Sequence, residues 1–187
     1  MVWGLTEKQG GVPLAGVVGG RVKDQIPIYG KSGDSPKQTA EAIAERCGRM
    51  RGEGYRAMKI YPLRQPTLDR AHQAVRLTRE ALGDEADMML DFAVQKDPRY
   101  ALQAARAFAP YRPYWIEEPV AGDNIPALAE FRSWTDIRIT TGERQSGVRH
   151  YRDVLHHRAA DVLNPDVTGA GGILTMLEVG AMAGAHS

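Results

Sequence analysis

The sequence predicts an α/β fold: an incomplete (β/α) barrel, in which about six of the eight strands form a parallel sheet with helices on its outside. Three observations lead to this prediction. Short apolar runs alternate six times with longer segments of helical periodicity, in units of about 25 to 30 residues. No GxGxxG motif follows an apolar run, which disfavours a dinucleotide-binding sheet. A complete barrel typically takes about 250 residues, whereas this chain has 187, so we expect a fragment or a partner chain that supplies the rest.

Six segments are expected to be strands, because each is a short run rich in apolar, β-branched or aromatic residues. In chain order they are Ile26–Tyr29, Ala57–Tyr61, Met88–Val94, Tyr114–Glu118, Arg138–Glu143 and Asp161–Asp166.

Six longer segments are expected to be helices, one after each strand. They are Lys37–Gly54, Thr67–Leu82, Pro98–Phe108, Ile125–Trp134, Val148–His157 and Ile173–Gly184. Ser35 and Pro36 have the chemistry of a cap and a first helical turn, so they predict the start of the first helix. Apolar residues at helical spacing give the second helix one buried face, and Gly83 is expected to end it.

The first residues fit none of these units. MVWGLTEKQGG is typical of the end of a helix with a glycine stop, and VPLAGVVGG is typical of a connecting segment. We therefore divide the chain into residues 1–24, the end of a preceding domain with its linker, and residues 25–187, a partial barrel.

Composition excludes several classes of function. The formal net charge is +1 and the basic residues are scattered, which disfavours binding to nucleic acid or anionic lipid. No apolar run approaches the roughly 18 residues of a membrane span. Cys47 is the single cysteine, so no disulfide can form within the chain, and a cytoplasmic location fits. Its helical surroundings predict a packed residue rather than a nucleophile.

Three acids recur at the ends of consecutive expected strands. Asp91, Glu117 and Glu143 are separated by 26 residues in each case (117 − 91 and 143 − 117). Acids at intervals of one unit, near the carboxyl ends of parallel strands, converge on the face where barrels carry their chemistry. Converging carboxylates repel one another unless a cation lies between them, and all-oxygen ligands favour Mg²⁺ over Zn²⁺.

Two further residues join this group. Lys59 lies on a neighbouring expected strand at what we take to be the corresponding height, where its charge could neutralise negative charge that develops on a substrate. Asp166 ends the sixth expected strand, and an acid there could orient a histidine.

With these residues in view, the chain resembles the enolase superfamily, in its mandelate racemase and muconate lactonizing enzyme group. VWGLTEKQGGVPLAGVVGG resembles the junction between that family's capping domain and its barrel, and GYRAMKIYP resembles the second-strand segment. MLDFAV, WIEEPV and TTGER resemble the three metal-binding strands, and LNPDVTGAGGI resembles the sixth-strand segment.

The resemblance implies roles for several residues. Asp91, Glu117 and Glu143 would hold Mg²⁺, to which the family binds a substrate carboxylate. A base then removes the α-proton, and the metal stabilises the enediolate. The resemblance further implies that Glu118 is an acid behind the metal ligands, and that Arg144 contacts the substrate or a ligand carboxylate.

The sequence departs from the family pattern where the base is expected. The family often has a second lysine two residues after the first, but here Lys59 is followed by Tyr61. A branch that resembles galactonate dehydratases has instead a histidine two residues after the first metal ligand, and here that position is Ala93. On the opposite side the family pairs the acid at Asp166 with a histidine, which would lie beyond Ser187.

Three hypotheses follow. The first is dehydration of a small-molecule sugar acid, because elimination can use a single base that returns its proton to the leaving hydroxyl. The second is a racemase, epimerase or cycloisomerase with Tyr61 or Lys59 as the opposite base. The third is a truncated barrel that binds metal without catalysis. The resemblance also implies that the full-length protein forms homo-oligomers.

Overall fold

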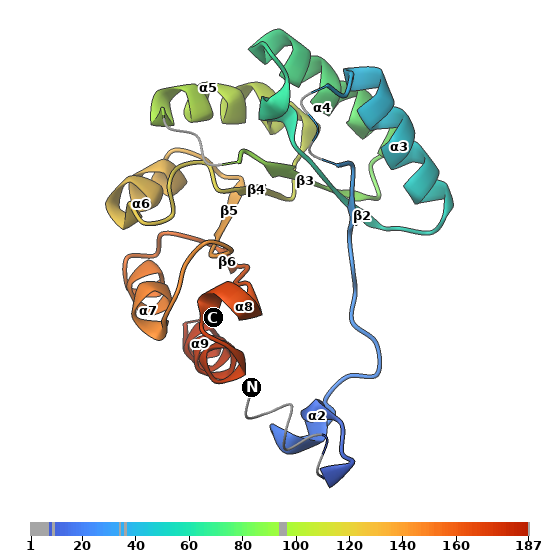
Figure 1. Ribbon diagram of the computed structural model, residues 1–187. Coiled ribbons are helices and arrows are strands. Elements are labelled where there is room, and N and C mark those ends of the chain that lie inside the picture. Colours follow the sequence, from blue (N-terminus) through green and yellow to red (C-terminus); the bar gives the residue numbers. More distant parts are fainter. Residues whose placement is uncertain (1–7, 9, 34, 36, 94–96, 187) are drawn as a thin grey trace.

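Six parallel strands, in sequence order from β1 to β6, form the single sheet found in the described residues (Figure 1). The computed structural model describes residues 8, 10–33, 35, 37–93 and 97–186. The strands are β1 (Gly30–Lys31), β2 (Ala57–Ile60), β3 (Asp87–Asp91), β4 (Trp115–Glu117), β5 (Arg138–Thr141) and β6 (Val162–Leu163). Each strand pairs only with its neighbour in sequence, as in a barrel wall, and this confirms the expected architecture.

Helices cover the outer side of the curved sheet, as Figure 1 shows for α3 to α7. The larger helices are α3 (Ala40–Gly52), α4 (Leu68–Leu82), α5 (Pro98–Phe108), α6 (Ile125–Ser133), α7 (Val148–His156) and α9 (Ile173–Ala185). The short ones are α2 (Leu14–Val17), α8 (Val167–Ala170) and the 3-10 turns η1 (Pro62–Arg64) and η2 (Ala109–Tyr111). None of the helices described here combines the length and the apolar content needed to cross a membrane.

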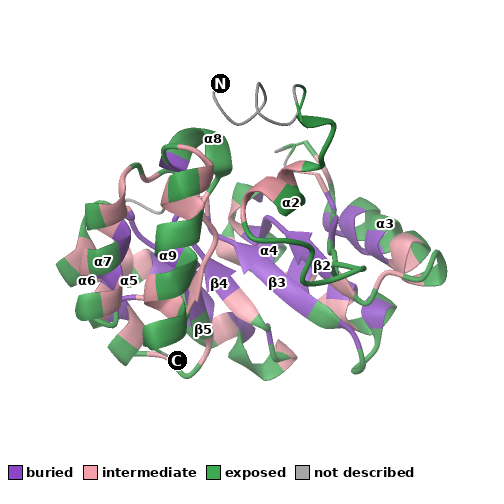
Figure 2. Ribbon diagram, turned by 90° about the horizontal axis from the view of Figure 1, so that it is seen from below, coloured by how far each residue is buried: buried purple, intermediate pink, exposed green. Residues whose placement is uncertain are grey.

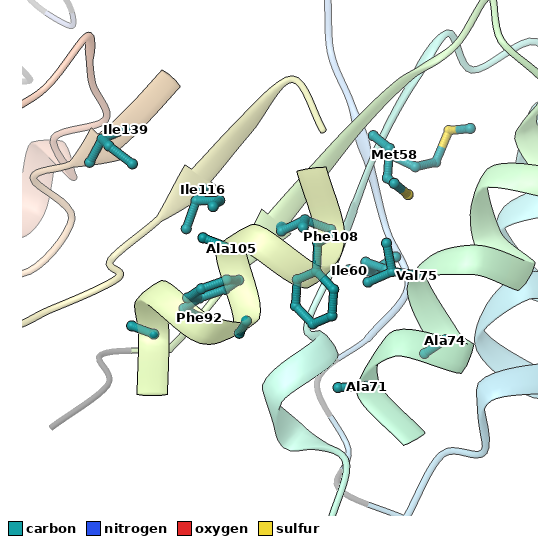
Figure 3. Close-up of a cluster of buried hydrophobic side chains, with 14 of the residues drawn as sticks. Met58, Ile60, Ala71, Ala74, Val75, Phe92, Ala105, Phe108, Ile116 and Ile139 are labelled. Atoms are coloured by element: carbon teal, nitrogen blue, oxygen red, sulfur yellow. The ribbon is translucent and has the colours of Figure 1, made fainter. Parts of the chain in front are cut away.

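The core lies between the outer face of the sheet and these helices (Figure 3). Strand residues alternate between two faces, so Ile60, Ile116 and Ile139 point outward toward apolar helix residues such as Val75 and Phe108. Cys47, on α3, is fully buried in the same cluster, as the sequence predicted for a packed residue. The purple strands in Figure 2 mark this buried layer. Packing on the outer face leaves the inner face free to carry polar groups.

The start of the first helix differs from the prediction. Helix α3 begins at Ala40, and the Thr39 side chain caps it by accepting a hydrogen bond from the Ala42 amide. Ser35 instead accepts a hydrogen bond from the Lys37 amide in the preceding turn, and Pro36 lies outside the described residues. Ser35 and Thr39 both have the side-chain chemistry of a helix N-cap. Thr39 occupies the N-cap position of α3 because it directly precedes the buried Ala40.

The first strand also differs. Ile26 and Ile28 are 77% and 70% exposed, and β1 is instead Gly30–Lys31, which pairs with Met58 and Lys59 of β2. Apolar composition predicted a strand over Ile26–Tyr29, but a strand also needs a neighbour to share its hydrogen bonds, and only the two residues that follow this segment pair with β2.

The remaining strands and helices are where the sequence placed them, and most of the strands end earlier than expected. Strand β5 stops at Thr141, short of Glu143, and β6 contains only two residues. Strand β3 stops at Asp91, and Val94 lies outside the described residues. The carboxyl ends of strands carry loops with irregular backbone, which apolar runs cannot delimit.

Near the amino terminus, the expected connecting segment contains a short helix, α2, with Pro13 at its N-cap position. Most of the expected glycine-stopped helix lies outside the described residues. Figure 1 shows α2 away from the sheet, at the end of a long extended segment.

Candidate active site at the carboxyl ends of the strands

Two of the predicted metal ligands are direct neighbours in the sheet. Asp91 ends β3, Glu117 ends β4, and the two residues are register partners. They are 5% and 1% exposed. Since residues paired across parallel strands project to the same face, both carboxylates lie on the inner face of the wall, as the spacing of the acids predicted.

The ammonium of Lys59 lies between these two carboxylates. Its Nζ is 2.8 and 2.7 Å from the two carboxylate oxygens of Glu117 and 3.1 Å from Oδ2 of Asp91. The other Asp91 oxygen, Oδ1, accepts a hydrogen bond of 2.8 Å from the Ala93 amide. The side chains of this cluster are almost completely buried.

Lys59 stands lower on the wall than the sequence predicted. Its register partner is Met89, two residues before Asp91, so the "corresponding height" is wrong by two residues, or about 6.6 Å at 3.3 Å per residue. The long lysine side chain spans this difference. Lys59 therefore reaches the acids from a position nearer the amino-terminal ends of the strands, not from their own level.

The cluster carries excess negative charge. Burial opposes the charged form of Lys59, but its hydrogen bond with Glu117 and the charges of Glu117 and Asp91 outweigh burial and raise its pKa above the ordinary value. Burial raises the pKa of Glu117; the hydrogen bond from Lys59 lowers it, and the charges of Asp91 and Glu143 raise it further. Two buried carboxylates share one ammonium, an arrangement that a further cation would stabilise.

Glu143 lies on the loop after β5, and its side chain is 40% exposed. Its Oε1 is 3.3 Å from Nε of Arg144, which is 59% exposed. Glu143 is near enough to Glu117 to raise the pKa of that residue. Within the described ranges, however, no three His, Cys, Asp or Glu side chains stand together as a group that could hold a metal ion.

The residues nevertheless suit Mg²⁺ by type, and two of the three also by place. All three acids offer oxygen ligands, the kind that a hard cation prefers. Asp91 and Glu117 are paired on adjacent strands, and Glu143 interacts with Glu117 through its charge. The donor chemistry therefore fits a hard cation, and Glu143, which contacts Arg144 here, is the acid that would have to reorient to complete the set.

Glu118, the second acid of the Glu-Glu pair, faces the other way. Its Oε1 accepts hydrogen bonds of 2.8 Å from the Thr141 hydroxyl and 3.2 Å from the Gly142 amide. Its Oε2 is buried without a hydrogen-bond partner among the described groups, and the residue has a left-handed φ of 48°. Burial raises the pKa of Glu118, and these hydrogen bonds oppose that effect. The alternation of a strand could have indicated this opposite orientation.

Two tyrosines stand beside Lys59. Tyr61 is 7% exposed, and the centroid of its ring lies 5.6 Å from the Lys59 Nζ and 5.4 Å from the Lys31 Nζ. The ring centroid of Tyr29 lies 5.8 Å from the Lys59 Nζ. Burial raises the pKa of Tyr29. The sequence predicted a site role for Tyr61 only, because Tyr29 precedes the short first strand and carries no recognisable motif.

Asp166 follows β6 and caps α8. Its Oδ1 accepts hydrogen bonds from the amides of Thr168 (2.6 Å) and Gly169 (3.2 Å) and from the Thr168 hydroxyl. These hydrogen bonds lower the pKa of Asp166. In the described part of the chain no histidine is bonded to Asp166, so its pairing with a histidine stays a prediction.

A family model described as "Enolase C-terminal domain-like" matches residues 42–187. The D-gluconate dehydratase of Thermoproteus tenax is 30% identical over all of this chain and 39% of its own length. The D-galactonate dehydratase of Klebsiella pneumoniae is 30% identical over 97% of the chain and 49% of its own length. The chain thus spans about half the length, or less, of these relatives.

Solved structures share the fold over nearly the whole chain. An enolase from the Sargasso Sea environmental genome superposes with a TM-score of 0.92 at 33% identity, over 98% of this chain and 49% of that one. The L-talarate dehydratase of Polaromonas sp. JS666, complexed with Mg and L-glucarate, superposes with a TM-score of 0.88 at 29% identity, over 99% and 51%. Given the family match and these relatives, the chain belongs to the enolase superfamily, as part of its barrel domain.

Proposed function

We propose that the protein is a Mg²⁺-dependent dehydratase of sugar acids, which removes the proton next to a substrate carboxylate and eliminates a hydroxyl group. The observation that carries this proposal is the buried cluster of Asp91, Glu117 and Lys59 at the carboxyl ends of adjacent strands. Gluconate and galactonate dehydratases among the relatives support the reaction class.

Asp91, Glu117 and Glu143 are the residues that would hold the metal. When bound, Mg²⁺ would stabilise the negative charge that develops on the substrate carboxylate as the α-proton leaves. The L-talarate dehydratase solved with Mg and L-glucarate supports this choice of ion and of substrate class.

Lys59 supplies a fixed positive charge beside that position. It is buried and held by two carboxylates, so its ammonium is fixed in position, and it would turn a donor to an anionic oxygen of the substrate once a metal ion neutralises these acids. Its raised pKa favours the ammonium form, which donates hydrogen bonds rather than accepting a proton. Arg144 is exposed at the rim, where it could contact a substrate.

The choice between a dehydratase and an isomerase depends on whether a second acid–base group faces the other side of the substrate's α-carbon. An isomerase needs acid–base groups on both faces of the α-carbon, and the group next to Lys59 is Tyr61, packed near two lysines. We assign Tyr61 a positioning role, and propose that the base comes from the Asp166 side.

The test is turnover by the full-length protein. Purified protein is incubated with Mg²⁺ and a panel of sugar acids that includes gluconate, galactonate and galactarate, and the 2-keto-3-deoxy products are assayed. We expect dehydration of at least one acid, its loss on chelation with EDTA and its recovery on adding Mg²⁺. Exchange of the α-proton with solvent deuterium without dehydration of any acid would favour an isomerase instead.

Other properties of the whole protein are proposals of the same kind. We propose that residues 1–24 connect the barrel to a capping domain, which is consistent with α2 lying apart from the sheet. We also propose a homo-oligomeric full-length form. A cytoplasmic location is consistent with the buried free thiol of Cys47.

A further inference from the structure

We infer that Tyr151, on α7, is a positioning residue that fixes the loop carrying Glu143 and thereby sets the affinity of the site for Mg²⁺. This inference rests on the proposed function, because it concerns one of the proposed metal ligands. Tyr151 lies outside the acid cluster.

The Tyr151 hydroxyl bridges both sides of Glu143. Its oxygen lies 2.9 Å from the carbonyl oxygen of Gly142 and 3.0 Å from that of Gln145. A phenol has one proton to donate, so the two carbonyls share it. The hydroxyl thus ties together the residues immediately before and two positions after the proposed ligand.

The position of the hydroxyl is itself fixed by packing. Tyr151 is fully buried in a small cluster with Ala170 and Val179, apart from the main core. Burial raises the pKa of Tyr151, with the charges of Asp166 and Glu118 adding to the effect, so the hydroxyl keeps its proton and stays a donor.

The opposite side of the same loop is held by Glu118, which accepts a hydrogen bond from the Gly142 amide. Gly142 has a φ of 131°, a conformation that favours glycine. A Cβ on this residue would lie 3.2 Å from Cε1 of Tyr151 and 3.4 Å from the backbone nitrogen of Asn164. The amide of Gly142 is thus held by one buried side chain and its carbonyl by another.

Glu143 needs this support more than the other two acids. Asp91 and Glu117 are strand residues, fixed by the ladder of the sheet. Glu143 lies beyond the end of β5, and its carboxylate contacts the exposed Arg144. Its place relative to Glu117 therefore depends on the backbone of the loop, and contacts that support a ligand from behind commonly change metal affinity by about 10- to 100-fold.

The experiment compares Tyr151→Phe with Tyr111→Phe in the full-length protein, by calorimetric titration with Mg²⁺ in the absence of substrate. Each change removes one hydroxyl group, from a fully buried tyrosine at position 151 and from a half-buried one at position 111. The Tyr111 hydroxyl contacts Nε2 of His72 at 3.1 Å. Tyr111 precedes β4, at the opposite end of the strands from Asp91, so it is a matched control. Circular dichroism and thermal unfolding check the fold of each variant.

We expect Tyr151→Phe to weaken Mg²⁺ binding about tenfold or more, and Tyr111→Phe to leave it unchanged at a similar loss of thermal stability. Equal affinity in Tyr151→Phe and wild type would overturn the inference, as would equal weakening in the two variants. Should Tyr151→Phe fail to fold, Gly142→Ala displaces the same loop with the hydroxyl retained, and unaltered binding there has the same meaning. A wild-type protein that takes up no Mg²⁺ would overturn the proposed function itself, and this inference with it.

Discussion

Lys59 is the residue on which the electrostatics of the inner face depend. It neutralises part of the charge of Asp91 and Glu117, and all three side chains are almost completely buried. Removing one partner of a buried ionic group leaves the others unpaired, which typically costs about 3 to 5 kcal/mol.

We therefore expect Lys59→Met to lower the free energy of unfolding by about 3 to 5 kcal/mol in Mg²⁺-free buffer. Added Mg²⁺ should restore part of this loss, since the ion would take over the neutralisation of both acids. Urea titrations with and without the metal measure both effects. A variant as stable as wild type without Mg²⁺ would show that the ammonium is not needed to balance the acids.

At this scale the sequence predicted that Asp91 and Glu117 lie side by side, but not how their side chains are arranged, and the convergence of Glu143 with them stays a prediction. Regular spacing placed Asp91 and Glu117 on neighbouring strands, because one unit of a barrel returns the chain to the same height. The register of Lys59 was off by two residues, since register depends on pairing hydrogen bonds that composition does not encode. Glu118 was predicted to lie behind the ligands, but its hold on the loop after β5 became visible only in the structure.

At the scale of elements, Asp161, which directly precedes β6, contacts both α6 and β5. Its Oδ1 accepts a hydrogen bond of 2.9 Å from Nε of Arg132 on α6, and its Oδ2 accepts one of 2.9 Å from the Ile139 amide on β5. Burial opposes ionisation of Asp161, but the hydrogen bonds from Arg132 and Ile139 and the charge of Arg132 outweigh it and lower the pKa.

A depressed carboxyl pKa stabilises the fold above the pKa of the unfolded state, and the contribution is lost as pH falls through the folded value. We expect Asp161→Asn to lower the free energy of unfolding by about 1 kcal/mol near neutral pH, a value kept small because the pair is partly exposed. The difference from wild type should shrink as pH falls below the ordinary aspartate range. Urea unfolding across pH measures it, and a difference that grows on acidification would contradict this account.

The helices were predicted more accurately than the strands. Thr67, Pro98 and Gly83 carry local chemistry that fixes where a helix begins or ends, and the structure has the corresponding boundaries within a residue. Strand limits depend instead on distant partners. Ile26 and Ile28 belong to an apolar run, yet β2 does not extend to them, so their backbone is outside the sheet.

At the scale of the whole molecule, the sheet is an arc with β1 and β6 at its two edges (Figure 1). The relatives are about twice as long as this chain or longer, and the comparison with them assigns the arc to an enolase-type barrel. The repeating units predicted this class of fold from the sequence alone, because each unit carries its own strand and helix pattern. No particular substrate was predicted from the sequence, and two relatives at 30% identity are named for different sugar acids.

The central claim is that Asp91, Glu117 and Glu143 hold one Mg²⁺. Calorimetric titration of the full-length protein with Mg²⁺ tests it most directly, comparing wild type with Asp91→Asn and with the control Asp87→Asn at the opposite end of β3. We expect one ion per chain in wild type and in the Asp87 variant, and binding weakened by at least tenfold in the Asp91 variant. No uptake by wild type, or equal affinity in all three proteins, would contradict the claim.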